Sequence, residues 1–131
     1  MIYLIHINSN LSYPRYNNKK YSTEDNRLSI TAETVTPTGH DITLNPNETL
    51  IVTYSCNNRG ETANIELGYG LNTRSMLSFF VEISGVRQYR PASATFVYTN
   101  NTNANITLYG LTRINIDTEL MYVDCNYIII K

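Results

Sequence analysis

The sequence lacks several features that define common protein classes. Its 131 residues include no tryptophan, two cysteines and two histidines, and only 16% are charged. No stretch approaches the roughly 20 apolar residues of a membrane span, so membrane insertion is not expected. A net charge of −1 and a pI of about 6.1 give no basic surface for nucleic acid. These absences exclude nucleic-acid and membrane partners from the expected function.

Chemical motifs are also scarce. There is no Cys-x-x-Cys spacing, and His6 and His40 lie far from both cysteines in the sequence, so no metal site is predicted. His40 and Asp41 form the one adjacent histidine–carboxylate pair, but no third group accompanies them. The Gly68–Gly70 stretch lacks the rest of a phosphate-loop fingerprint and indicates a bulge or a close strand contact. We expect no catalytic residue, no cofactor and no enzymatic activity.

Cys56 and Cys125 are the two cysteines. They allow either one disulfide or two buried free thiols, and the residues alone leave both alternatives open.

What the sequence does contain is β-strand signals at short, regular spacing. Helical periodicity is absent over any three turns, whereas β-branched and tyrosine-rich runs alternate with clusters of Gly, Pro and Asn. The predicted strands are residues 1–7, 27–35, 41–44, 49–56, 64–71, 78–84, 94–99, 104–111, 112–116 and 119–130. This pattern predicts an all-β sandwich of two antiparallel sheets.

Alternation assigns faces to some strands. Leu50, Val52 and Tyr54 share one face of their strand, and Val123, Cys125 and Tyr127 share one face of the last strand. Residues 128–130 are three consecutive isoleucines without alternation, which indicates a strand covered on both faces. Such a strand is central in its sheet or lies inside an oligomer.

The N-terminal segment differs from the rest. Residues 1–27 are predicted to form a strand or arm followed by a polar linker, and residues 28–131 the main domain. Residues 8–26 are interpreted as a surface loop or linker, with a basic contact patch around Lys19 and Lys20 as the alternative. The apolar opening is too short for a signal-peptide core and has no preceding basic residue. It is interpreted instead as a β-strand or an assembly arm, whose apolar residues are Ile2, Tyr3, Leu4, Ile5 and Ile7.

From residue 41 onward the chain resembles the compact jelly-roll heads of bacterial collagen-like and spore-surface (exosporium) glycoproteins, relatives in fold of complement-type and tumour-necrosis-factor heads. The matching pieces are "ITLNPNETLIVTYS", "NIELGYGLNTRS", "SATFVYTNNTNANITLYGL" and the closing "YIIIK". The collagen stalk is missing and both cysteines are additional.

The resemblance implies a jelly roll in which the closing strand runs antiparallel beside residues 49–56. It thereby implies a disulfide between Cys56 and Cys125, and a homotrimer with the closing strands at the threefold axis. The residues expected at that interface are Tyr127, Ile128, Ile129 and Ile130.

The expected function is therefore a self-assembling structural or surface-display subunit on the outer surface of a bacterial spore, cell or phage, reached by a route other than a secretory leader. The alternative is a carbohydrate- or receptor-binding module. Arg87, Tyr89 and Arg90 are its candidate glycan contacts, because tyrosine stacks on sugars and arginine binds carboxylates.

Overall fold

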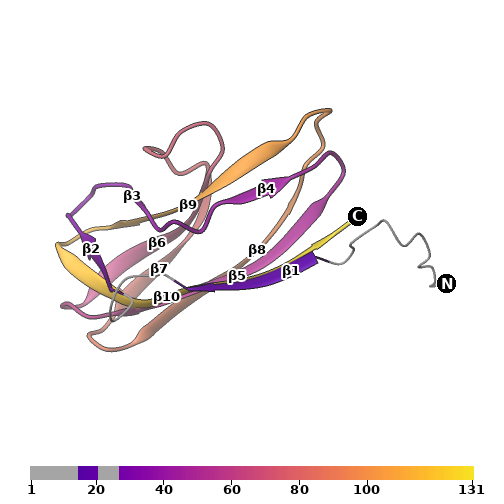
Figure 1. Ribbon diagram of the computed structural model, residues 1–131. Helices are drawn as coiled ribbons and strands as arrows, with labels where there is room; N and C mark the ends of the chain where they lie inside the picture. The colour runs from indigo at the N-terminus through magenta and orange to yellow at the C-terminus, as the bar shows by residue number, and fades with distance from the viewer. Residues whose placement is uncertain (1–14, 21–26) are drawn as a thin grey trace.

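The computed structural model describes residues 15–20, through their backbone, and residues 27–131. In this part of the chain every regular element is a β-strand (Figure 1). The strands are β1 (Arg15–Lys20), β2 (Arg27–Ile30), β3 (Thr36–Pro37), β4 (Ile42–Leu44), β5 (Thr49–Asn58), β6 (Ala63–Gly70), β7 (Phe79–Val86), β8 (Pro91–Thr99), β9 (Ile106–Ile114) and β10 (Thr118–Ile130).

The strands form two sheets, and every neighbouring pair is antiparallel. Sheet A has the order β1-β10-β5-β8, and β2 pairs with the first part of β10. Sheet B has the order β3-β9-β6-β7, and β4 pairs with the first part of β9. The closing strand β10 is therefore central in sheet A and antiparallel to β5, as predicted.

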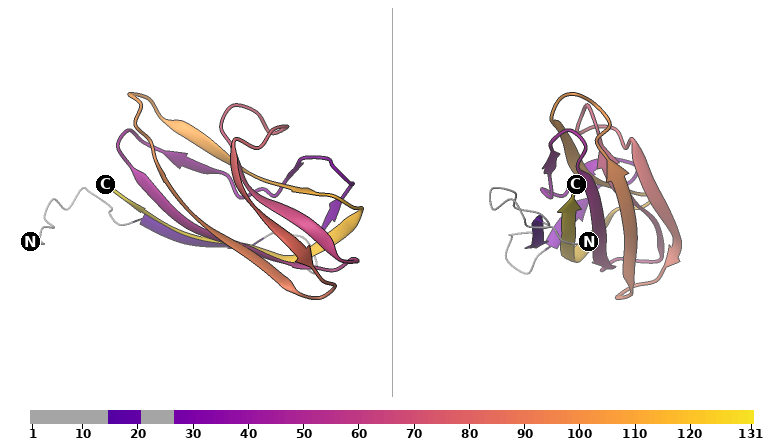
Figure 2. Two further views of the ribbon diagram at one scale, coloured as in Figure 1. Left: turned by 180° about the vertical axis from the view of Figure 1, so that it is seen from behind. Right: turned by 90° about the vertical axis from the view of Figure 1, so that its right-hand side faces the viewer.

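The connections between the sheets make the sandwich a jelly roll. From β4 onward the chain passes from sheet B to β5 in sheet A, back to β6 and β7, and then to β8, β9 and β10 in alternate sheets. This interleaving of two Greek keys is the jelly-roll topology. Figure 1 and the two views of Figure 2 show the two layers and the C-terminus lying beside the start of β1.

The core is formed where the inner faces of the two sheets meet. Its centre is aromatic: the ring centroids of Tyr54 and Tyr69 are 5.7 Å apart, and Phe79 stacks on Tyr98 at 5.1 Å. Leu50, like Tyr54, is completely buried, which confirms the faces predicted for this strand. Aromatic pairs at these separations stabilise a core beyond the area they bury.

The N-terminal region departs from the prediction. Arg15–Lys20, expected to belong to a polar linker, is strand β1 and pairs with β10 from Asp124 to Ile129. The linker prediction was wrong here because pairing with a distant strand, rather than local polarity, decides the conformation. The arm residues Ile2, Tyr3, Leu4, Ile5 and Ile7 lie outside the described residues, and the boundary at residue 27 stays a prediction.

Two other strand predictions were wrong in their bounds. The segments expected as separate strands at 104–111 and 112–116 form the single strand β9. The strand expected at 27–35 ends at Ile30. The Gly68–Gly70 stretch is a close strand contact, as predicted: a Cβ atom on Gly68 would lie 2.1 Å from the carbonyl oxygen of Phe79.

Candidate functional site

The C-terminal half of β10 has two distinct faces. Tyr127 packs against the core and Ile129 is 1% exposed, whereas Ile128 is half-buried and Ile130 is 39% exposed. The expectation that residues 128–130 are covered on both faces was wrong within one chain, because the alternation seen at 123–127 continues to the end of the strand. Of the four predicted interface residues, the structure directs Tyr127 and Ile129 inward and leaves Ile128 and Ile130 for an outer surface.

Ile128 belongs to an apolar row that crosses three strands on the outer face of sheet A. Its direct partner on β5 is Ile51, and Ile51 is in turn opposite Val97 on β8. Val97 is 68% exposed, the largest value among the exposed large hydrophobic residues described. We call Ile51, Val97 and Ile128 the apolar row. Sequence reasoning missed Ile51 and Val97 because only the register brings them level with Ile128.

The surroundings of the apolar row are polar but almost uncharged. On one side Thr49 and Thr99 are hydrogen-bonded through their hydroxyl groups at 2.7 Å, and on the other Thr53 and Thr95 at 3.2 Å. Along the outward positions of β5, β8 and the part of β10 after its bulge, Asp124 is the single charged residue; before the bulge, Glu119 is paired with Arg59. Depletion of charge around an apolar centre is the compositional signal of a protein–protein interface.

The outer face of sheet B differs. Arg113 binds both carboxylate oxygens of Glu66 at 3.0 and 3.1 Å, and this pairing raises the pKa of the Arg113 guanidinium. Arg74 pairs with Asp41 at 2.6 Å and lies 5.2 Å from the centre of the Tyr109 ring. Two arginines of this face therefore have carboxylate partners within the same chain.

The end of the sandwich where β5 stops carries the predicted glycan contacts. Arg90 donates its backbone N–H to the carbonyl of Arg87 at 3.1 Å, which closes a β-turn with Tyr89 at its third position. Tyr89 has a φ of 61° and is 62% exposed, whereas the turn residue with positive φ is ordinarily glycine or asparagine. Both arginines are also exposed. The structure thus brings Arg87, Tyr89 and Arg90 together.

Asn58 holds this turn in place. It is completely buried, and its backbone N–H donates to the carbonyl of Arg90 while its carbonyl accepts from the N–H of Tyr89 at 2.6 Å. Its side-chain amide donates to the carbonyls of Val86 and Glu61, both at 2.8 Å. The backbone of Asn58 therefore holds the Arg87–Arg90 turn, and its side chain ties the end of β7 to the loop after β5.

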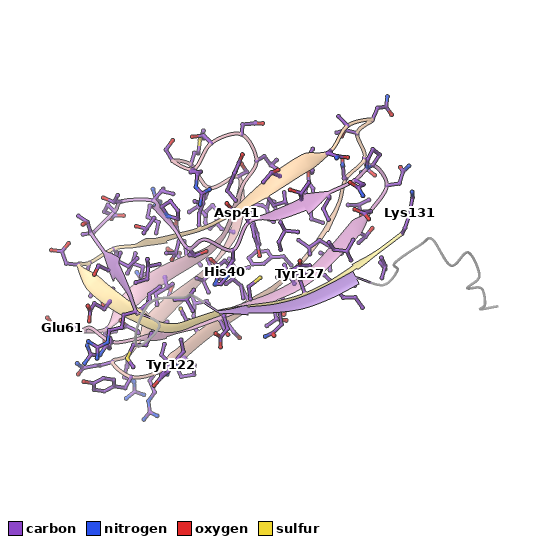
Figure 3. The ribbon with its side chains drawn as sticks, viewed as in Figure 1. His40, Asp41, Glu61, Tyr122, Tyr127 and Lys131 are labelled. Carbon is purple, nitrogen blue, oxygen red and sulfur yellow. The ribbon has the colours of Figure 1, made fainter. Side chains whose placement is uncertain are left out.

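A second exposed tyrosine lies at the same end. The register of β10 against β5 shifts between Met121 and Asp124, so that Tyr122 and Val123 both oppose a single residue of β5. In this bulge Tyr122 has a φ of 51° and is 51% exposed, and Figure 3 shows it at the end that also carries Glu61. Sequence reasoning missed Tyr122 because nothing local marks a bulge. We call Arg87, Tyr89, Arg90 and Tyr122 the Arg–Tyr end.

An open depression adjoins the Arg–Tyr end. Its volume is about 360 Å³, and Gln88 connects it to the turn by donating from its side chain to the carbonyl of Arg59 at 3.1 Å. Arg59 itself is paired with Glu119 at 2.9 Å. The lining residues are Ile30, Arg59, Gly60, Asp117, Thr118 and Glu119.

Cys56 and Cys125 are both buried and both free thiols in the structure. Burial raises the pKa of the Cys56 thiol to about 12, which suppresses its nucleophilic thiolate form. Cys125 is paired with Tyr54, two residues before Cys56, so the cysteines are diagonal neighbours on adjacent strands. Diagonal neighbours are about 7–8 Å apart, longer than the span of an unstrained disulfide. The register thus counts against the bridge, which stays a prediction.

His40 and Asp41 face different partners. Buried His40 places its Nε2 3.1 Å from the carbonyl oxygen of Val123, in the bulge of β10 (Figure 3). Asp41 accepts from Arg74 at 2.6 Å and from the N–H of Gly110 at 3.3 Å. The two side chains therefore have structural contacts to opposite sheets. Across residues 27–131 no group of three histidine, cysteine or carboxylate side chains is arranged to hold a metal.

Comparisons with known proteins bear on the fold alone. No protein-family model matches the sequence. No curated protein matches it either. Among solved structures, a chain from the structure of infectious bursal disease virus, Gx strain, is similar with a TM-score of 0.58 at 10% sequence identity. The match covers 98% of this chain and 36% of the viral chain, so this chain spans about a third of that length.

The viral chain shares the β fold across nearly the whole of this protein, and the topology confirms the jelly roll that the resemblance implied. Kinship with bacterial collagen-like and exosporium heads stays a prediction. In the described part of the chain, no helix is long or apolar enough to cross a membrane.

Proposed function

We propose that the protein is a non-enzymatic structural subunit that assembles with copies of itself through the outer face of sheet A. The observation that carries the proposal is the apolar row: three aliphatic side chains level with one another across three strands, bordered by hydrogen-bonded threonines. Covering such a row with a second copy removes apolar area from water at about 25 cal/mol per Å². Ile130 extends the same surface toward the end of the chain.

A trimer on the outer surface of a spore, cell or virion is the finer form of this proposal. The threefold arrangement is supported by the resemblance to trimeric jelly-roll heads, and Ile128 is the closing-strand residue that would contact the other subunits. The similar fold of a chain from a virus structure supports the virion among these locations.

The test is the solution mass of the full chain, measured by light scattering after size exclusion, with and without reductant. We expect a discrete oligomer that reductant does not change, because both thiols are buried. Val97→Glu should give a folded monomer, since it would bury an unpaired carboxylate in the interface. Met76→Glu is the matched control: Met76 is similarly exposed, at 61%, but lies outside sheet A.

A monomeric wild type at high protein concentration would contradict assembly. Loss of the oligomer in both variants would contradict the role of the apolar row. If the wild type forms polymers that reductant dissolves, the subunits are joined by intermolecular disulfides and not by the apolar row. Circular dichroism of Val97→Glu separates loss of assembly from loss of folding.

A glycan-binding role is the second candidate, and a specific observation favours it. The exposed Tyr and Arg that this role requires gather at one end of the sandwich: Arg87, Tyr89, Arg90 and Tyr122. Binding at this end is compatible with assembly through the apolar row, because the two surfaces have no residue in common.

A further inference from the structure

Two tyrosines of the Arg–Tyr end have the same unusual backbone conformation, with a positive φ. Among the described residues, four non-glycine residues have positive φ, and two of them are the exposed tyrosines Tyr89 and Tyr122. A bulky residue in left-handed backbone is uncommon and persists where the surroundings determine it, as they do at functional sites. Here Asn58 determines the conformation at Tyr89, and the β10 bulge determines it at Tyr122. Both arrangements fix an aromatic ring at the same end of the molecule.

The two arginines of this end form no ion pair within the described residues. Among the described residues, the ion pairs join Arg59 to Glu119, Arg74 to Asp41 and Arg113 to Glu66. Arg87 and Arg90 take part in none of these pairs, although they are brought together at the two ends of one turn. Two guanidinium groups flanking an exposed ring offer planar donors for a carboxylate and a stacking surface for a sugar ring.

The adjoining depression supplies the remaining polar groups. Thr118 donates from its hydroxyl to the side-chain oxygen of Asn58 at 3.0 Å, and Asp117 accepts from the N–H of Ala32 at 2.8 Å. A carboxylate has several acceptor positions, so Asp117 and Glu119 retain capacity for hydroxyl donors. The depression, at about 360 Å³, lies at the small end of the range of ligand sites.

We propose that the Arg–Tyr end binds a saccharide bearing a carboxylate, such as a sialic or uronic acid. Arg87 and Arg90 take the carboxylate, Tyr89 stacks on the sugar ring, and the depression accepts hydroxyl groups of the neighbouring sugar. The inference narrows the glycan-binding candidate to one ligand class and is independent of assembly through the apolar row.

The experiment is a binding titration of the full chain by isothermal calorimetry or ligand-observed NMR with three probes. Sialyllactose and trigalacturonate carry carboxylates, and lactose is the neutral match of the first. We expect at least one acidic probe to bind, and lactose to bind at least about tenfold more weakly, because hydrogen bonds to charged groups are the stronger class.

Single variants then locate the site. Arg87→Gln and Arg90→Gln should each weaken binding by about tenfold, the loss expected for one charged hydrogen bond. Arg74→Gln is the matched control, because Arg74 is also an exposed arginine beside a tyrosine but is paired with Asp41. The control should bind as the wild type does. Tyr89→Gly removes the ring and suits the backbone, so it tests stacking without a folding defect.

Three results would overturn the inference: no binding of either acidic probe at millimolar concentration, equal binding of lactose, or an equal loss in Arg74→Gln and Arg90→Gln. Light scattering on the same variants separates the two proposals. Arg90→Gln should keep the oligomer, and Val97→Glu should keep the binding. An oligomer that binds no acidic saccharide contradicts the inference alone, and a monomer that binds one contradicts assembly alone.

Discussion

The outer faces of the two sheets belong to one fold but differ in how they meet their surroundings. Sheet B has Arg113 bound by Glu66 through two hydrogen bonds, and Arg74 bound to Asp41 above the ring of Tyr109. Leu111 on β9 is nevertheless completely buried. A Cβ atom on the neighbouring Gly70 would meet the carbonyls of Thr73 and Met76 at 2.6 Å, so the loop after β6 packs closely over this part of the sheet.

Around the apolar row, sheet A has neither device among the described residues; its ion pair between Arg59 and Glu119 lies before the bulge of β10. Its hydrophobic residues lie in a row across three strands, its threonines bond to one another, and Val97 is 68% exposed. Sheet B buries Leu111 in this way but leaves Phe80, level with it across Gly68, 46% exposed, so the two faces differ mainly in their ion pairs and in the loop over Leu111. A second copy of the chain is the cover we propose for sheet A.

The largest predicted effect concerns the core that both sheets share. Cys56 ionises near pH 9.0 when exposed, and burial raises its pKa to about 12 in the folded protein. The folded state therefore retains a proton that the unfolded state loses, so this contribution is complete below pH 9.0 and is lost as the pH rises toward 12. The loss amounts to about 4 kcal/mol by pH 12. Urea unfolding at pH 8 and at steps up to pH 12 measures it.

The control for this prediction is Cys56→Ala. Its free energy of unfolding should fall less steeply than that of the wild type between pH 9 and 10. Above pH 10 both proteins should lose stability, because burial also raises the pKa of Tyr54 and of Tyr69 above their usual value. A free energy of unfolding that stays constant from pH 8 to pH 11 would contradict the buried thiol.

The second prediction sharpens the contrast between faces within a single strand. Ile129 points into the core and Ile128 points outward. Ile129→Ala should lower the free energy of unfolding by about 3 kcal/mol through lost burial and a cavity. Ile128→Ala should cost less than about 1 kcal/mol in dilute monomer, yet weaken assembly. Denaturation at low protein concentration, together with light scattering at high concentration, measures both effects.

Equal losses of stability in the two variants would contradict the assignment of faces. The conservative changes Ile128→Val and Ile129→Val provide a check on scale. Ile129→Val should lower the free energy of unfolding by about 1 kcal/mol, whereas Ile128→Val should leave it almost unchanged.

Sequence patterns predicted much of the fold because the relevant forces are local. Alternation placed Leu50, Val52 and Tyr54 on the inner face of β5, and turn residues separated most of the strands correctly. Three successive isoleucines concealed the same alternation at the end of β10, since every position is apolar whichever way it faces. No polar residue in this stretch marks the outward positions.

Other features depend on pairing between distant segments. The polar stretch at Arg15–Lys20 forms a strand because β10 offers an edge to it. Ile51, Val97 and Ile128 become neighbours only through the register of three strands, and Tyr122 is displaced by a bulge that has no local signature. The turn at Arg87–Arg90 was found from composition, but its left-handed tyrosine was not. Candidate sites whose residues meet only through strand register could therefore not be predicted from the sequence.

The third prediction tests whether sheet B is complete without a partner. Glu66→Gln should remove the charge that Arg113 pairs with and lower the free energy of unfolding by about 1 kcal/mol, since the pair is only partly buried. Assembly should not change. Chemical denaturation and light scattering measure the two quantities, and a change in oligomeric state would show that the ion pair of sheet B belongs to an interface after all.

The smallest predicted effect is a gain at the Arg–Tyr end. Tyr89 has a φ of 61°, a region in which glycine suffers no clash between Cβ and the backbone, so Tyr89→Gly removes a cost of about 1 kcal/mol. The greater backbone entropy of glycine in the unfolded chain cancels part of that gain. We therefore expect the free energy of unfolding to rise by about 0.5 kcal/mol, measured by urea denaturation at pH 7. Because the same change removes the ring proposed to stack on the sugar, this gain should accompany the loss of saccharide binding. A loss of more than about 1 kcal/mol would instead assign Tyr89 a packing role and remove the backbone argument for a site at this end.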